Sequence, residues 1–279
     1  AYVTWSRLRD QNLRMGQMKV PFDRQRVTSS SALQMVDRSI VVDELNLDRD
    51  VGIQILSNDF LGIGKLTYQA GVFGGDGRNR TSDAPGVLWV GRLQFQPFGG
   101  FYSVDDRTES DFEHSSDPRL ALAAGVARNT ITNRAQSTFG NIYEFARFNY
   151  QHWEGDLVFK WNGWSLLGEA ISRSANQPYV EALQDGQLSR EYSRSAWGYF
   201  IQSGYLFRNN IELAARYGRV RPMGLTDPNL HPMKEIGPSL SWYLKENQLK
   251  IQSDYFYLIG AENENRKRHQ LRLQMQVYF

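Results

Sequence analysis

The chain contains no cysteine, and this absence excludes several kinds of chemistry at once. Among its 279 residues there is no disulfide, no thiolate metal site and no cysteine nucleophile. An excess of charge of one sign is also missing, because 32 Lys and Arg stand against 30 Asp and Glu, a formal net charge of +2. A protein that coats nucleic acid carries a clear basic excess, so no nucleic-acid partner is expected.

Long hydrophobic runs are missing as well. The longest apolar run covers residues 120–127, far short of the ~18 consecutive apolar residues that a membrane helix needs. Aromatic residues nevertheless make up 13% of the chain, which is too rich for a segment that cannot build a core. The chain is therefore expected to fold, but without a helix that spans a bilayer.

Motifs for catalysis, metals or cofactors are scarce. The stretch GIGKL at 62–66 resembles a phosphate loop only superficially, because the first glycine is lacking and Leu66 replaces Ser or Thr. The four histidines are scattered without the spacing of metal ligands, and no G-x-S-x-G nucleophile turn occurs. We therefore predict no catalytic residue, no metal site and no cofactor, and we do not expect an enzyme.

Alternation of apolar and polar residues is the main pattern that is present. The last ten residues, QLRLQMQVYF, place Leu271, Leu273, Met275, Val277 and Phe279 at every second position. A period of two indicates a strand with one apolar and one polar face. Segments of this kind run about 8–13 residues, which suits the ~9–11 residues of a strand that crosses a bilayer. Thirteen of them begin near residues 1, 11, 50, 62, 86, 118, 150, 164, 195, 210, 233, 248 and 267.

The connections between these segments alternate in length. Short ones lie at 9–12, 58–62, 160–164, 207–210 and 245–248, and long ones at 21–49, 74–86, 129–149, 174–194 and 221–232. Short turns at one end and long loops at the other are typical of outer-membrane barrels. A soluble sandwich or barrel with one wet face is the alternative. Aromatic residues near the ends of the apolar faces and polar residues on the opposite faces favour the membrane barrel.

The sequence thus predicts an all-β fold, a transmembrane antiparallel β-barrel of about thirteen strands forming one domain over 1–279. Its last strand is expected to pair back to the first, with Phe279 at the periplasmic rim. Bacterial single-chain barrels have even strand numbers. Further strands upstream of Ala1 are therefore expected. A second strand hidden in 140–161 is the competing explanation.

The stretch LRMGQMKVPFDRQRVTSSSALQMVDRS at 13–39 resembles the phosphate-selective porin O and P family, and the likeness continues through 50–55, 68–77 and 91–98. Met18 replaces the aromatic residue usual in that family, and Asp37 replaces a Glu. The matching positions are Gly16, Gln17, Lys19, Pro21, Phe22, Thr28, Ser29, Ser30, Arg38 and Ser39.

The resemblance implies a barrel of sixteen strands in the outer membrane of a Gram-negative-type bacterium, surrounded by lipid. It also implies a homotrimer that passes small anions through a channel narrowed by an inward-folded loop. Here that constriction loop is residues 21–49, with a short helix expected after an N-cap at Thr28 or Ser29. Its charged residues mix both signs, as in a general porin without ion preference: Arg24, Arg26, Asp37, Arg38, Asp43 and Glu44.

Basic residues on the polar faces are the candidates for anion preference, because a cation in a narrow pore offsets an anion's lost hydration. They are Lys19, Lys65, Arg92, Lys160, Arg216, Lys250 and Arg272. Against them stand Asp156, Glu169, Glu212, Glu235 and Asp254. Seven against five predicts a weak anion preference at most. The alternative is that these charges pair across strands and only keep the interior wet.

Residues 98–118 form an acidic connection on the predicted periplasmic side, with Asp105, Asp106, Glu109, Asp111, Glu113 and Asp117 against Arg107. This stretch is either a solvated excursion or a docking site for a basic periplasmic protein. For the whole molecule, the alternative to a diffusion porin is a structural barrel that serves as an anchor or scaffold for an envelope machine.

Overall fold

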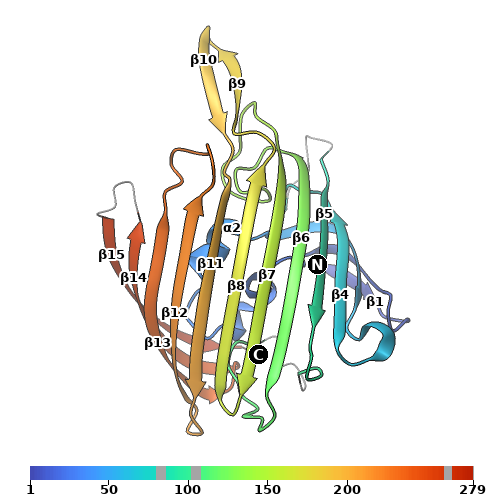
Figure 1. Cartoon of the computed structure of the whole chain (residues 1–279), viewed down its shortest axis with the longest axis vertical. Coiled ribbons are helices and arrows are strands. Elements are labelled where there is room, and N and C mark those ends of the chain that lie inside the picture. Colours follow the sequence, from blue (N-terminus) through green and yellow to red (C-terminus); the bar gives the residue numbers. More distant parts are fainter. Residues whose placement is uncertain (80–85, 102–107, 261–265, 279) are drawn as a thin grey trace.

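Thirteen strands pair in chain order into one antiparallel sheet, and each begins within a few residues of its predicted start (Figure 1). The computed structural model describes residues 1–79, 86–101, 108–260 and 266–278, so Phe279 lies outside the described residues. The strands of the sheet are β1 (Tyr2–Trp5), β2 (Asn12–Lys19), β3 (Arg49–Ser57), β4 (Leu66–Phe73), β5 (Leu88–Phe95), β6 (Arg119–Thr132), β7 (Phe148–Trp161), β8 (Trp164–Ala175), β11 (Ala196–Leu206), β12 (Ile211–Pro222), β13 (Met233–Lys245), β14 (Leu249–Gly260) and β15 (Arg266–Val277).

The sheet curls around a central space but does not close in the described part of the chain. There β1 pairs only with β2, and β15 pairs only with β14, so the predicted pairing of the last strand with the first is not present. The region 140–161 holds the single strand β7 rather than two strands. The miscount proposed for that region is therefore wrong.

Two further strands form a separate hairpin that the period-two pattern did not predict. β9 (Tyr179–Gln184) and β10 (Gln187–Tyr192) pair with each other inside the long connection 174–194. The hairpin projects beyond the sheet at the end where the long loops lie (Figure 1). The turns between β7 and β8, β11 and β12, and β13 and β14 are short and lie at the opposite end, which we call the short-turn end.

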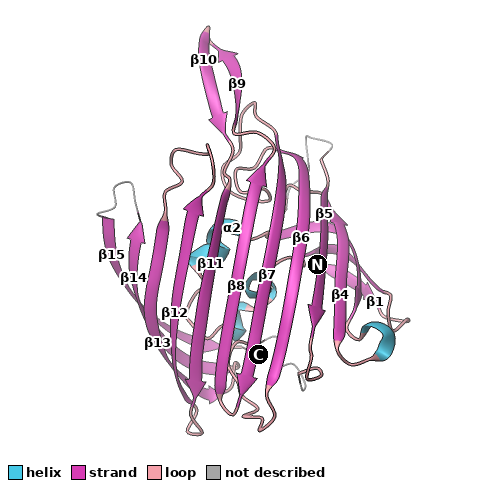
Figure 2. Ribbon diagram, viewed as in Figure 1, coloured by secondary structure: helices cyan, strands magenta, loops and turns pink. Residues whose placement is uncertain are grey.

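The described residues also contain four short helical turns: α1 (Arg24–Val27), η1 (Ser30–Ala32), α2 (Ile40–Leu45) and η2 (Phe60–Gly62). Figure 2 shows α2 behind the strands, inside the curl of the sheet. The short helix expected after Thr28 or Ser29 is the 3-10 turn η1, capped by Ser29, whose hydroxyl accepts a hydrogen bond from the amide of Ser31. Asp23 and Ser39 cap α1 and α2 in the same way.

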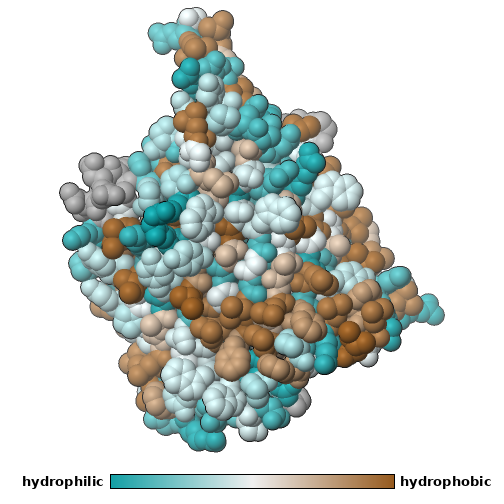
Figure 3. All heavy atoms as spheres, in the orientation of Figure 1, coloured by the Kyte–Doolittle hydropathy of each residue, from teal (hydrophilic) through white to brown (hydrophobic). Residues whose placement is uncertain are grey.

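The two faces of the sheet differ as the alternation predicts. On β13, Ile236, Leu240 and Trp242 are about half exposed, whereas Glu235 and Ser241, at the alternate positions, are buried on the inner face. In Figure 3 hydrophobic side chains gather in a belt across the strands of the outer face, with hydrophilic side chains at both ends. None of the helices in the described ranges is both long and apolar enough to cross a membrane.

Aromatic rings line both margins of this outer face. At the short-turn end the rings of Trp164 and Tyr205 lie 4.9 Å apart between centroids. At the long-loop end Tyr199 lies near Trp197 and Tyr217, at 6.2 and 6.1 Å. Amphipathic rings of this kind prefer the two boundaries between lipid and water. An apolar outer belt between aromatic margins and a polar inner face are the features of a membrane-spanning barrel.

Candidate functional site

Residues 21–49, the predicted constriction loop, lie on the inner face of the sheet. Its helix α2 packs against β8, β11 and β12, and Val41 and Leu45 join an apolar cluster with Ile171 and Phe200 of the inner wall. Burial of these side chains removes apolar surface from water, which stabilises the folded-in loop. The inner face is therefore not polar throughout: an apolar core lies inside the barrel, beneath the loop.

Glycines on the inner wall make room for the loop. A Cβ atom at Gly125 of β6 would lie 2.9 Å from the carbonyl oxygen of Phe22. At Gly204 of β11 it would lie 2.2 Å from the side-chain nitrogen of Gln34. At Gly125 the close atom belongs to the backbone of the loop, so glycine lets the loop lie this close to β6. At Gly204 the close atom is the end of the Gln34 side chain, which would have to shift to admit a Cβ atom.

A buried cluster of charges fixes the start of the loop. Arg24 donates to Asp156 on β7, with 2.5 Å between Nε and Oδ1, and its backbone amide donates to Glu169 on β8. Arg92 on β5 pairs with both Asp156 and Glu154 and donates to the carbonyl of Phe22. The Asp156 and Glu154 side chains are fully buried. Buried carboxylates of this kind require paired cations.

A second group of charges holds α2. The Glu44 carboxylate accepts from Arg173 of β8 at 2.6 Å and from Arg194 at 2.8 and 2.9 Å. Arg194 also pairs with Asp227 at 2.7 Å. Burial by itself would raise the pKa of Glu44, but the hydrogen bond from Arg194 and the charges of both arginines hold its pKa below the ordinary value. Glu44 therefore stays ionised at neutral pH.

Several of the basic residues predicted to line a pore donate hydrogen bonds to the constriction loop. Lys250 donates to the carbonyl of Leu33, and Lys19 donates to the carbonyls of Val27 and Thr28. Arg216 donates to the carbonyls of Asp37 and Arg38 and pairs with Glu235 at 3.0 Å. Their hydrogen bonds position the loop, and a role of these side chains in lining a pore stays a prediction.

A polar cavity of about 270 Å³ remains between the loop and the wall formed by β13–β15. Arg26, Arg38, Arg268 and Arg272 line it, together with Asp37, Asp43 and Glu235. Arg272 is paired with Asp254 at 2.7 Å and lies 3.5 Å from Asp37, and Arg26 is paired with Asp48. The lining therefore carries a small excess of arginine over carboxylates.

The cavity brings together five of the predicted site residues: Arg26, Asp37, Arg38, Asp43 and Arg272. Lys65 lies apart from them, exposed just before β4 at the short-turn end. Lys160 is buried on β7 and donates to Thr108 and to the carbonyl of Ser110. A pore-lining role for these residues stays a prediction.

Three arginines that line the cavity or pair with Glu44 were not predicted from the sequence: Arg268, Arg173 and Arg194. Arg268 and Arg173 have the inward parity of β15 and β8, because they stand an even number of residues from Arg272 and Glu169. Extension of the period-two pattern toward the strand ends would have found both. Arg194 lies in the long connection after β10, where no pattern in the sequence marks it.

The acidic connection 98–118 does not stay outside the barrel. Glu109 and Asp111 are buried, with 6% and 1% of their surface exposed. Glu109 accepts from the amide of Gln34 in the loop, and Asp111 accepts from the amide of Gly163 in the turn between β7 and β8. A fully solvated excursion is therefore wrong for these residues. Glu113 and Asp117 are exposed, while Asp105, Asp106 and Arg107 lie outside the described residues. Docking of a basic partner stays a prediction for the exposed part.

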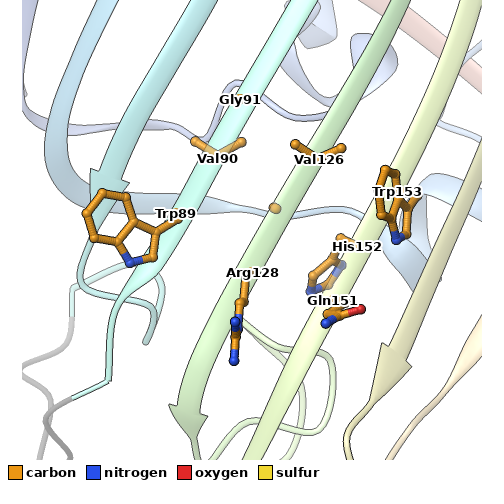
Figure 4. Close-up of a pocket in the computed structure, with 9 residues that line it drawn as sticks. Trp89, Val90, Gly91, Val126, Arg128, Gln151, His152 and Trp153 are labelled. Carbon is orange, nitrogen blue, oxygen red and sulfur yellow. The ribbon is translucent and has the colours of Figure 1, made fainter.

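A second hollow of about 290 Å³ opens on the outer face, over β5, β6 and β7. Trp89 and Trp153 flank it, and Gly91 leaves space between them, while Arg128 and Gln151 lie at one end (Figure 4). Trp89 and Trp153 are about 60% exposed. The hollow therefore faces the lipid side of the sheet and is separate from the interior cavity.

An apolar belt outside, a polar wall inside and a loop folded into the interior define an outer-membrane β-barrel of the porin class. A model of one porin family matches residues 1–279, and the chain belongs to that family, the phosphate-selective porin O and P family. The resemblance in the first hundred residues is thus confirmed over the whole chain. The family and the fold place the protein in the outer membrane.

Comparisons with individual proteins agree with this assignment. The chain is 24% identical over 295 residues to an uncharacterized protein of Aquifex aeolicus (strain VF5), covering 100% of this chain and 67% of that protein. It is similar in fold to an anion-selective porin from Comamonas acidovorans, with 11% identity, a TM-score of 0.59, and 99% and 72% of the two chains covered. It is also similar to the trimer form of OmpT, an outer membrane protein of Vibrio cholerae, with 10% identity, a TM-score of 0.50, and 95% and 73% covered.

Proposed function

We propose that the chain lines a water-filled passage through the outer membrane for small hydrophilic solutes, with a weak preference for anions such as phosphate. The observation that carries this proposal is the cavity beside the constriction loop, with its four arginines and three carboxylates. A cation in a narrow, partly dry space offsets the hydration that an anion loses on entry. The nearby carboxylates keep this preference small.

The proposal also includes the orientation of the barrel in the membrane and its oligomeric state. Long loops of outer-membrane barrels lie outside the cell and short turns face the periplasm, so the short-turn end is assigned to the periplasm. The trimer form known for the similar OmpT supports a homotrimer here. The chain is proposed to act as a channel rather than as an enzyme, with lipid as its surroundings and no cofactor.

Reversal potentials in a KCl gradient across a planar bilayer test the anion preference. The wild type should prefer chloride over potassium, and Arg268→Glu should reduce that preference about two- to threefold, because it reverses one of four positive charges in the cavity. Arg208→Glu is the matched control, since Arg208 is exposed in the turn between β11 and β12 and carries the same charge change. A cation-selective wild type would contradict the proposal.

A scaffold barrel without conduction is the second candidate. It is supported by the packing of the interior, which the constriction loop enters from the long-loop end and residues 108–112 enter from the short-turn end. Single-channel recording separates the two candidates. Discrete steps of ion current support the porin, whereas a purified, folded protein that gives no current supports the scaffold.

A further inference from the structure

We propose that residues 108–112, here called the inner segment, form a second constriction that enters the barrel from the short-turn end. We further propose that Glu109 is the positioning residue that joins it to the constriction loop. The constriction implied by the family resemblance concerned only the loop at 21–49. The inner segment belongs to the connection between β5 and β6, whose acidic composition indicated exposure to solvent.

The path of the inner segment can be followed from the rim inward. At the rim, the amide of Asn162 and the indole nitrogen of Trp161 donate to the carbonyls of Ser115 and Ser116, each at 2.9 Å. The Asp111 carboxylate accepts from the amide of Gly163, at 2.7 Å. The segment thus starts at the turn between β7 and β8.

Ser110 lies deeper and is held by three strands of the wall. Its hydroxyl donates to Glu212 of β12 at 2.8 Å and lies 2.8 Å from the hydroxyl of Tyr243 on β13. Its carbonyl accepts from Lys160 of β7 at 2.9 Å. The ring of Phe112 meets the ring of Tyr243 edge to face, 4.9 Å between centroids.

Glu109 makes the connection to the constriction loop. One carboxylate oxygen accepts from the Gln25 side chain at 2.9 Å; the other accepts from the amide of Gln34 at 2.8 Å and from Gln202 of β11 at 2.9 Å. The amide of Glu109 donates to the carbonyl of Ala32. Gln202 pairs in register with Leu167, three residues into β8, so Glu109 lies roughly 10 Å above the turn at ~3.3 Å per residue.

These contacts link the inner segment to the cavity. Gln25, which donates to Glu109, accepts from the amide of Ser39 with its side-chain oxygen and from Arg38 with its carbonyl. Arg38 lines the cavity along β13–β15. Glu109 therefore fixes the orientation of the Gln25 amide and, through it, the part of the loop that carries Arg38. With 108–112 in place, solutes are directed to the side of the interior that faces β13–β15.

Thiol labelling tests the position of the segment without any need for conduction, and the absence of native cysteine makes the signal specific. Ser110→Cys in the otherwise unchanged chain should react with a charged methanethiosulfonate about tenfold more slowly than Asp117→Cys, because Ser110 is buried and Asp117 is exposed. Addition of Glu109→Ala to Ser110→Cys should bring the rate close to that of Asp117→Cys. Equal rates for the two single variants would overturn the proposal.

Single-channel conductance tests the consequence for transport and rests on the proposed channel function. Glu109→Ala should raise conductance about twofold by freeing the inner segment, whereas Asp117→Ala, which removes the same charge at an exposed site, should leave it unchanged. A conducting wild type with identical currents in both variants would overturn the second constriction. A wild type that never conducts would instead count against the proposed channel, and the thiol rates would still decide where the segment lies.

Discussion

The Asp23 carboxylate caps a helix, but its burial opposes its ionisation. Its carboxylate caps α1 by accepting from the amide of Arg26 at 2.7 Å, yet the residue is fully buried. Burial raises the pKa of Asp23 to about 6, against the hydrogen bond from Arg26 and the charges of Arg92, Arg26 and Arg38. The carboxylate of Glu169, which accepts from the amides of Arg24 and Gln25, is part of the same surroundings.

The raised pKa sets the sign of a pH effect. The folded chain binds this proton more tightly than the unfolded chain does, so the Asp23 contribution to stability falls as pH rises from its ordinary pKa of 3.8 to about 6. Asp23→Asn keeps an N-cap residue but cannot ionise. It should therefore be more stable than the wild type at pH 7.5, by up to ~3 kcal/mol, and nearly equal to it at pH about 4.

Thermal unfolding of the detergent-solubilised protein, followed by its β-sheet circular dichroism, measures this difference. Asp117→Asn is the control, because it removes a carboxylate from an exposed position of the chain. A stability gap between Asp23→Asn and wild type that is the same at both pH values would contradict the assignment.

At the scale of elements, the strands follow from local pattern, whereas the helices α1 and α2 do not. The positions of the strands and the directions of their side chains were predictable, because successive side chains face lipid and the interior in turn. A few residues are enough to show this alternation in the sequence. The turns α1 and α2 span four and six residues, too few to show a helical period. They form because they are capped and packed against the inner wall.

The hairpin β9–β10 shows a signal that was present but overlooked. Asp185 and Gly186 occupy its turn with positive φ of 49° and 80°, and an Asp-Gly pair between alternating residues is typical of a two-residue hairpin turn. The ion pairs of the interior had no such signal. Arg24 and Asp156 are 132 residues apart, so the sequence predicts that both face inward but not that they meet.

The attachment of α2 rests on Glu44, and its removal gives a prediction for this element. Glu44→Gln leaves the buried Arg173 without its carboxylate, so the loss in the free energy of unfolding should be ~3 kcal/mol, as for other buried pairs that lose one partner. Asp43→Asn changes the neighbouring carboxyl, which faces the cavity, and should alter stability by less than about 1 kcal/mol. Urea unfolding measures both, and equal effects would contradict the attachment.

For the whole molecule, the charge balance limits how ions are chosen. A formal net charge of +2 over 279 residues gives little overall field, so any anion preference depends on the few arginines around the cavity. Such an effect is screened by salt, because the Debye length falls from about 10 Å at 0.1 M to about 3 Å at 1 M. The chloride-to-potassium permeability ratio should therefore approach one in 1 M KCl.

Paired recordings at the two salt concentrations measure this ratio. The Arg268→Glu variant serves as the comparison, since its cavity has lost the basic excess and its ratio should vary less with salt. A wild-type ratio that stays constant between 0.1 and 1 M would mean that selectivity comes from size or from a fixed site rather than from these charges.

The apolar cluster beneath the constriction loop gives this barrel two hydrophobic surfaces that face different solvents. The outer belt contacts acyl chains or detergent. The cluster around Val41, Leu45 and Phe200 is instead stabilised by the hydrophobic effect, which removes its apolar surface from water. A chaotrope that acts through water weakens the inner cluster first, and an exchange of detergent acts on the belt alone. We therefore expect denaturation to pass through a state in which the interior has come apart while the strands remain paired in the micelle.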